Sequence, residues 1–224
     1  MKALVLRGNA DLVYEDVSEP APAMVGRGSK KMAADILVKV AYSGICGSDM
    51  PRAFKGKAYH YPLVMGHEFS GVVEEAPLSS TYRKGDRVVV FPLVPCKQCT
   101  ACATGDFAQC ADYDYYGSRR DGGFAEYVRV GEANLFPVPD HVDLRSAAMT
   151  EPCAVALHGV ERLSIKAGMS ALVLGGGPVG NMVAQWLRLK GCDQIYVAEV
   201  DSRKRDIAEK MGFIPIDSSQ VDLV

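Results

Sequence analysis

Four of the seven cysteines of this 224-residue chain lie close together, at positions 96, 99, 102 and 110. The spacing C-x2-C-x2-C-x7-C lets neighbouring sulfur atoms surround one ion, and four thiolates make a closed tetrahedral zinc site. A ferredoxin-type motif places three residues before its fourth cysteine and a proline after it, whereas seven residues precede Cys110 and Ala111 follows it. The odd cysteine count argues against a disulfide framework. We therefore predict that Cys96, Cys99, Cys102 and Cys110 bind a structural zinc ion.

A second set of metal-ligand residues is spread along the chain. Cys46 lies in the stretch GICGSDMP, His67 lies in MGHEFSG, and Glu151 begins EPCAVALHG. A thiolate, an imidazole and a carboxylate are ligands of the kind that a catalytic zinc uses, with a fourth position left open. Spacing alone also allows two ordinary alternatives, a small buried cysteine and a histidine–glutamate pair at the surface.

Three neighbours of these residues are placed to assist such a site. Glu68 follows His67 and is either an alternate ligand or a carboxylate behind the ligands. Ser48 lies two residues after Cys46, where its hydroxyl can carry a proton, and Asp49 can orient the imidazole ring of His67.

The stretch GGGPVG fits the dinucleotide-binding pattern G-x-G-x-x-G. An apolar segment, 169–177, runs into it and an amphipathic segment, 179–191, follows, which is the strand–turn–helix context that the pattern requires. We predict that backbone N–H groups of this turn receive a pyrophosphate. The predicted cofactor-binding residues of the turn are Gly175, Gly177, Pro178, Val179 and Gly180.

Glu199 ends the next apolar segment, nineteen residues after Gly180. An acidic residue at this place is expected to hydrogen-bond the ribose hydroxyls and to favour NAD over NADP. Arg203, Lys204 and Arg205 follow it closely. They weaken that preference or form a solvated helix face, and we include Arg203 among the predicted cofactor-binding residues.

The elements that must position these residues change in character near residue 150. Residues 1–150 alternate short apolar segments with Gly, Pro and Asp, which predicts an antiparallel, barrel-like β domain. Its clearest predicted strands are 36–44, 70–76, 86–92 and 124–130. Residues 151–224 alternate apolar strands with helices and predict the first part of a doubly wound parallel sheet, so the fold class is α/β plus β. Residues 144–163, at the junction, have helical apolar spacing.

Composition restricts the partners. A formal net charge of −2 provides no basic stripe for phosphates, so we expect no nucleic acid partner. No apolar segment approaches the roughly 20 residues that span a bilayer, and we interpret the N-terminal segment as a first strand and not as a signal peptide. We therefore expect a cytoplasmic protein with no membrane partner and with reduced thiols.

The combination of GICGSD, GHEFSG, the four-cysteine lobe at 95–111, EP and GGGPVG resembles the zinc-dependent medium-chain alcohol and polyol dehydrogenases over the whole chain. The resemblance implies a GroES-like β domain followed by a Rossmann domain, here incomplete. It implies a catalytic zinc bound by Cys46, His67 and Glu151, a structural zinc bound by the four cysteines, and NAD. It also implies a homo-oligomer, a dimer or tetramer, for the full-length form.

Residues 46–71 and 109–128 are similar to the sorbitol dehydrogenase branch, and within it to members that act on the phosphate ester of a sugar alcohol. The expected reaction oxidises a secondary alcohol to a ketone. Such a substrate needs cations, for which we name Arg119 and Arg120, and His60 is expected to line the substrate cleft. The rival phosphate ligands are Arg52, Lys55 and Lys57. Two alternatives stay open, a polyol or diol without phosphate and a zinc-binding module without activity.

Overall fold

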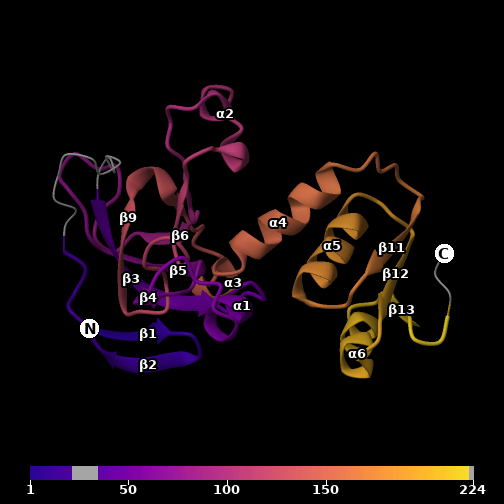
Figure 1. Ribbon diagram of the computed structural model, residues 1–224. Coiled ribbons are helices and arrows are strands. Elements are labelled where there is room, and N and C mark those ends of the chain that lie inside the picture. Colours follow the sequence, from indigo (N-terminus) through magenta and orange to yellow (C-terminus); the bar gives the residue numbers. More distant parts are fainter. Residues whose placement is uncertain (22–34, 222–224) are drawn as a thin grey trace. The chain divides into compact units, whose positions relative to one another are not determined.

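The computed structural model describes residues 1–21 and 35–221. The chain divides into two compact units, Met1–Glu151 and Pro152–Val224, each with its own sheets and apolar core (Figure 1). The predicted fold class, an antiparallel β domain plus the strands and helices of a parallel α/β sheet, is confirmed. None of the described helices is both long enough and apolar enough to span a bilayer.

A five-stranded antiparallel sheet in the order β10-β6-β5-β3-β9 forms the centre of the first unit. Its strands are β3 (Asp35–Gly44), β5 (Glu68–Glu75), β6 (Arg87–Val90), β9 (Tyr127–Gly131) and β10 (Leu135–Pro137). β-Branched side chains such as Ile36, Val73 and Val130 are buried on this sheet and pack around Phe69. Two register shifts between β3 and β5 mark bulges, one with its extra residue on each strand.

A smaller sheet of the same unit supports the first ligand turn. It has the order β2-β1-β4 and consists of β1 (Lys2–Gly8), β2 (Asp11–Asp16) and β4 (Leu63–Val64). Helix α1 (Asp49–Phe54) follows Cys46 and buries Ala53 against Leu6 and Leu63 of this sheet. The apolar contact fixes α1 and thereby the turn that precedes it.

The four-cysteine segment is closed at its base by two short strands. Strand β7 (Leu93–Val94) pairs antiparallel with β8 (Asp114–Tyr115), so the chain leaves and re-enters the unit at one place. Helix α2 (Thr100–Ala103) and the 3-10 turn η1 (Phe107–Gln109) lie between them, and Figure 1 shows this loop projecting from the sheets of its unit. A second 3-10 turn, η2 (Glu132–Asn134), connects β9 to β10.

The segment predicted as one helical stretch, 144–163, forms two helices. These are α3 (Leu144–Ala147) and α4 (Thr150–Glu161). Pro152 has no N–H to donate to the carbonyl of Ala148, so the hydrogen-bond ladder cannot run through this point, whereas proline is tolerated in the first turn of α4. The interruption places Glu151 at the start of a helix.

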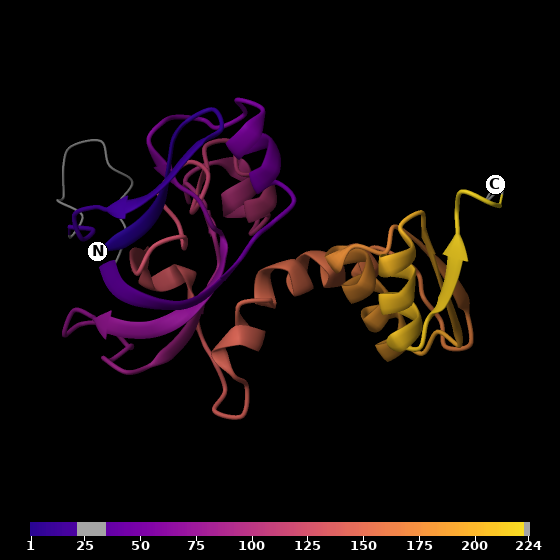
Figure 2. The same ribbon diagram turned by 90° about the horizontal axis from the view of Figure 1, so that it is seen from below.

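The second unit is a βαβαβ segment with parallel strands in the order β11-β12-β13. Its elements are β11 (Ser170–Leu174), α5 (Pro178–Leu189), β12 (Gln194–Glu199), α6 (Ser202–Lys210) and β13 (Ile214–Asp217). Figures 1 and 2 show α5 and α6 on the same face of the sheet, as two right-handed crossovers in one direction require. Val173, Val197, Leu187 and Phe213 are buried in the core of this unit.

Candidate functional site

The first group of candidate metal ligands lies where two neighbouring strands of the main sheet end. One ligand atom each of Cys46, His67 and Glu68 lies within 4.8 Å of the other two. The β3–β5 pairing runs to Gly44 opposite Glu68, so the turn after β3 and the turn before β5 are adjacent. Cys46 belongs to the first turn and His67 to the second, which explains how ligands far apart in the sequence converge.

A fully buried carboxylate, that of Asp49, connects the two turns. Its Oδ2 accepts a hydrogen bond from the Cys46 N–H at 3.0 Å, and its Oδ1 lies 3.6 Å from Nδ1 of His67. This Nδ1 is buried and has no hydrogen-bond partner among the described residues. A metal-binding histidine usually directs its second nitrogen at a carboxylate, so the arrangement leaves Nε2 for an ion. One thiolate, one imidazole and one carboxylate form a donor set that fits zinc.

Arg52 lies behind this group. Its Nη1 donates a hydrogen bond to Oγ of Ser48 at 2.9 Å and lies 3.4 Å from Oδ1 of Asp49. Because Arg52 donates to the serine oxygen, the Ser48 hydroxyl keeps its own hydrogen to pass on. The sequence offered Arg52 only as a rival phosphate ligand, whereas the structure places it in contact with the residues that support the metal group.

Glu151, predicted as a ligand, is not a member of this close group. Its Oε1 accepts a hydrogen bond from the Tyr115 hydroxyl at 3.2 Å, and the Tyr115 ring lies edge-on to His67 with ring centroids 5.8 Å apart. Burial raises the pKa of Glu151, although the nearby His67 opposes the rise. In this structure Glu68 lies beside Cys46 and His67, and ligation by Glu151 stays a prediction. Sequence analysis missed Tyr115, since no spacing signal distinguishes it from the other tyrosines.

The second group consists of the four cysteines between β7 and β8. The sulfur atoms of Cys96, Cys99, Cys102 and Cys110 all lie within 4.8 Å of one another. The N–H groups of Ala111 and Cys102 point at the Cys99 sulfur and lower the pKa of that thiol to about 6. The Cys96 N–H likewise donates to the Cys110 sulfur at 3.2 Å. The donors at Cys99 favour its thiolate, the form that binds metal, whereas burial raises the pKa of Cys102 to about 12. Four converging sulfur atoms fit a closed zinc site.

The glycine-rich loop of the second unit connects β11 to α5. Gly177 is the residue before the helix and Pro178 is its first residue, a common place for proline. A Cβ atom at Gly180 would lie 1.9 Å from the carbonyl oxygen of Gly175, so only glycine lets the helix approach the loop this closely. The first N–H groups of α5 have no partners within the helix and form a candidate pyrophosphate site.

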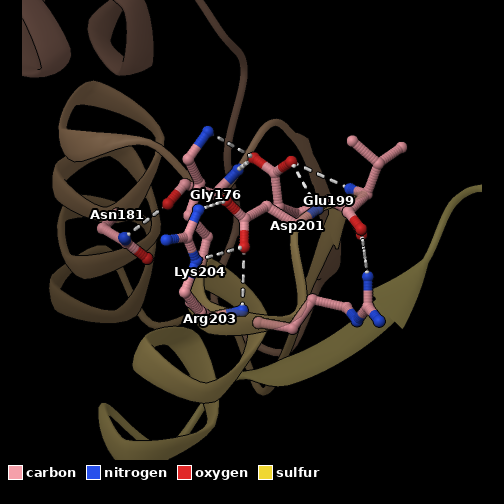
Figure 3. A network of polar contacts seen from close by, with 8 residues as sticks. Gly176, Asn181, Glu199, Asp201, Arg203 and Lys204 are labelled. Atoms are coloured by element: carbon pink, nitrogen blue, oxygen red, sulfur yellow. Dashed lines mark hydrogen bonds and ion pairs between the residues drawn. The ribbon is translucent and has the colours of Figure 1, made fainter.

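Glu199 ends β12 and faces this loop (Figure 3). Its Oε2 accepts a hydrogen bond from the Gly176 N–H at 3.0 Å. Its Oε1 accepts from the N–H groups of Val200 and Asp201 at 2.8 and 3.1 Å. These backbone donors, led by Asp201 and Gly176, lower the pKa of Glu199. The carboxylate thus binds the loop itself, and its predicted contact with ribose stays a prediction.

The two arginines predicted to hold a phosphate have different environments. Arg120 donates from Nε to Oδ2 of Asp114 at 2.7 Å and forms an ion pair with the same carboxylate. Arg119 is exposed, and its guanidinium lies over the rings of Tyr59 and Tyr113, 4.4 and 4.3 Å from their centroids. Among the residues that the structure describes, no acidic side chain pairs with the Arg119 guanidinium, whereas that of Arg120 is paired with Asp114.

His60, the third predicted substrate residue, lies next to Arg119. Its Nε2 is 3.2 Å from the Arg119 carbonyl oxygen, and its Nδ1 is 3.0 Å from that of Pro62. The ring therefore connects the two segments that carry the candidate substrate residues. A direct role of His60 with substrate stays a prediction.

Comparison with known proteins agrees with this geometry. The family model of the alcohol dehydrogenase GroES-like domain matches residues 32–140. Galactitol 1-phosphate 5-dehydrogenase of Escherichia coli (strain K12) is 37% identical over 179 residues, 80% of this chain and 52% of that protein. (R,R)-butanediol dehydrogenase of Bacillus subtilis (strain 168) is 34% identical over an alignment of 236 positions, gaps included, which covers 99% of this chain and 64% of that protein. The chain is therefore similar to alcohol and polyol dehydrogenases along almost its whole length.

Solved structures of similar dehydrogenases extend the comparison. Galactitol-1-phosphate dehydrogenase from Escherichia coli superposes with a TM-score of 0.90 at 32% identity, over 99% of this chain and 62% of that one. A protein described as a zinc-binding dehydrogenase from Sinorhizobium meliloti 1021, bound to NADP, superposes with a TM-score of 0.89 at 34% identity, over 99% of this chain and 63% of that one. An alcohol dehydrogenase from E. coli CFT073, complexed with NADH, superposes with a TM-score of 0.88 at 30% identity, over 100% of this chain and 64% of that one. The resemblance predicted from the motifs is confirmed, and the chain spans less than two thirds of the length of these relatives.

Replacing Cys99 by serine removes the thiol whose pKa is lowered to about 6. We expect bound zinc to fall from about two ions per chain to about one and thermal stability to decrease, because structural zinc contributes directly to folding. Elemental analysis after dialysis measures the metal. Cys153→Ser, at a cysteine outside both groups, serves as the control and is expected to retain all the zinc. Unchanged zinc content in Cys99→Ser would contradict the assignment.

Gly44→Ala tests the position of Glu68. An added Cβ would lie 2.3 Å from Oε2 of Glu68, so the carboxylate must move, whereas at Gly47 it would meet nothing within 4 Å. We expect Gly44→Ala to weaken metal binding at the Cys46–His67 group by about 10- to 100-fold, and Gly47→Ala to leave it unchanged. Competition with a chelator measures the affinity. Equal affinities in the two variants would show that Glu68 is not a ligand.

Glu199→Gln tests the connection between β12 and the glycine-rich loop. Since the pKa of Glu199 is lowered on folding, its contribution to stability is complete above the ordinary value of 4.5 and is lost as the pH falls through the lower, folded value. We expect the urea midpoint of unfolding at neutral pH to be higher for the wild type than for Glu199→Gln. We expect this difference to shrink below pH 4.5. Trp186, the only tryptophan, lies in α5 and reports unfolding of this unit by fluorescence. A difference that does not change with pH would contradict the assignment.

Proposed function

We propose that this chain carries the zinc-binding and dinucleotide-binding parts of an oxidoreductase that converts a secondary alcohol of a polyol to a ketone. We assign residues 1–150 to a GroES-like zinc domain with its lobe at 95–111, and residues 151–224 to a partial Rossmann domain. The observation that carries the proposal is the group of Cys46, His67 and Glu68, which offers three ligand types and leaves a fourth position for a hydroxyl oxygen.

Cys46, His67 and Glu68 would hold a zinc ion, which would supply the Lewis acidity that lowers the pKa of a substrate hydroxyl, and the glycine-rich loop would hold NAD, the hydride acceptor. The side chains of the chain perform the remaining tasks. Asp49 orients His67 and holds the Cys46 turn, and Ser48, which accepts a hydrogen bond from Arg52, passes the hydroxyl proton onward from Oγ. The products are a ketone, a reduced dinucleotide and one released proton.

The cofactors we propose are NAD, one zinc ion at the open group and one at the four-cysteine group. Similar structures hold NADH or NADP, and the carboxylate of Glu199 at the end of β12 favours a cofactor without a 2′-phosphate. The four thiols must stay reduced to bind metal, which fits the cytoplasm as the compartment. A homo-oligomeric full-length form stays a prediction.

For the substrate we propose a sugar-alcohol phosphate similar to galactitol 1-phosphate. Two observations support it, the similarity to a galactitol 1-phosphate 5-dehydrogenase and the exposed Arg119 guanidinium between two tyrosine rings. A guanidinium fork matches a phosphate well. The second candidate is a polyol or diol without phosphate, which the similarity to (R,R)-butanediol dehydrogenase favours.

A zinc-loaded sample of the chain is assayed for NAD reduction with galactitol 1-phosphate and with galactitol. We expect the phosphate ester to be the better substrate. We expect Arg119→Ala to lower kcat/KM for this ester by about ten-fold, because it removes about one charge-assisted hydrogen bond, and to leave kcat/KM for galactitol unchanged. Lys39→Ala, at an exposed cation with no proposed role with substrate, is the control and is expected to have no effect.

Equal efficiency on both alcohols would exclude phosphate recognition. A chain that retains both zinc ions, oxidises neither alcohol and gives no heat on calorimetric titration with NAD would instead be a zinc-binding module, which is the alternative of a different class.

A further inference from the structure

The carboxyl end of β12 is surrounded by charged side chains in which each basic residue has an acidic partner. The pairs are Arg203 with Asp201 at 2.9 Å, Lys204 with Glu199 at 3.5 Å and Arg205 with Asp217 at 2.8 Å. Figure 3 shows the first two pairs beside the loop residue Gly176. The positive and negative charges at this end of the strand therefore balance. A phosphate group of a cofactor can bind here only if one of these cations leaves its acidic partner.

Lys204 is less available to a phosphate than Arg203, because its partner Glu199 is held in place by other contacts. Glu199 is only 8% exposed, and its carboxylate already accepts hydrogen bonds from three backbone N–H groups. A carboxylate has about four acceptor positions, so these bonds and Lys204 use nearly all of them. Arg205 is also committed, because its Nη1 donates to the carbonyl oxygens of Glu199 and Val200 at 2.9 and 2.8 Å.

Arg203 is different, because its side chain is 88% exposed. Its Nε and Nη2 lie 3.2 and 2.9 Å from the two oxygens of Asp201, which is a bidentate pairing. Asp201 also accepts from the Arg203 N–H at 3.0 Å and so caps α6. One carboxylate thus performs two separable tasks, capping the N-terminus of α6 and holding the guanidinium.

We propose that Asp201 is a positioning residue that selects the cofactor by withholding Arg203 from a 2′-phosphate on the adenosine ribose. The inference rests on the proposed function, since it takes the loop from Gly175 to Gly180 as the dinucleotide site. A 2′-phosphate on ribose is usually accommodated by an arginine near the end of this strand. Here that arginine is present, and its two donors are directed at Asp201. Removing the carboxylate while keeping the cap turns the guanidinium into a phosphate ligand.

The test uses two adenosine fragments that differ only at the ribose. Adenosine 5′-monophosphate stands for the NAD end and adenosine 2′,5′-bisphosphate for the NADP end, and neither requires a nicotinamide site. Calorimetric titration of the whole chain is compared among the wild type, Asp201→Ser, Arg203→Ala and the double variant. Serine keeps an oxygen that caps α6, and Asp201→Asn repeats the test with a second capping side chain. Circular dichroism verifies that each variant is folded.

We expect Asp201→Ser to tighten binding of the bisphosphate by about ten-fold, as one charge-assisted hydrogen bond provides, and to leave the monophosphate unchanged. We expect Arg203→Ala to abolish that gain in the double variant. A gain of the same size without Arg203 would overturn the inference, because it would reflect only the loss of a negative charge. Absence of any gain in both Asp201 variants would overturn it as well.

These results are distinguishable from failure of the proposed function. A wild type that binds the monophosphate while the Asp201 variants gain nothing refutes only the role of Asp201. A wild type and variants that bind neither fragment refute the dinucleotide site itself, and the inference with it.

Discussion

The buried carboxylate of Asp49 is the interaction on which the arrangement of the first metal group depends. A buried carboxylate without partners is strongly unfavourable, so its position is fixed by the groups that satisfy it. Here these groups are the N–H of Cys46 and the Nη1 of Arg52, and Nδ1 of His67 faces the carboxylate at 3.6 Å. Each of them belongs to the metal group or contacts it. The same contacts that stabilise the buried charge therefore place a sulfur ligand and orient an imidazole ligand.

The two metal groups of the first unit suit different roles, one structural and one catalytic, although both include cysteine ligands. The four-cysteine group lies in a loop closed by the β7–β8 pair, and backbone N–H groups are directed at its sulfur atoms. All four positions around an ion are thiolates, which suits a structural role. The Cys46–His67–Glu68 group is built at the ends of two strands of the main sheet and has one ligand fewer. Its open position and the adjacent Ser48–Arg52 hydrogen bond fit the chemistry proposed above for an alcohol substrate.

In the second unit, the parallel strands bring the glycine-rich loop and the end of β12 together, and Glu199 connects them through backbone hydrogen bonds. A carboxylate used in this way has little capacity left for a ligand. The choice between cofactors then depends on the charged side chains that follow, where every cation is paired. In the proposal above, discrimination between cofactors therefore depends on these ion pairs.

The sequence by itself determined the features that are encoded within a few residues. The cysteine spacing and the G-x-G-x-x-G turn place their groups through local geometry, so the four sulfur atoms and the start of α5 lie where the pattern puts them. Only the tertiary structure decided which glutamate lies beside Cys46, and which arginine stays exposed near the tyrosines. These outcomes depend on strand register and on packing between residues far apart in the chain. Spacing along the sequence carries no information about either, because the direction of a side chain is set by its neighbours in space.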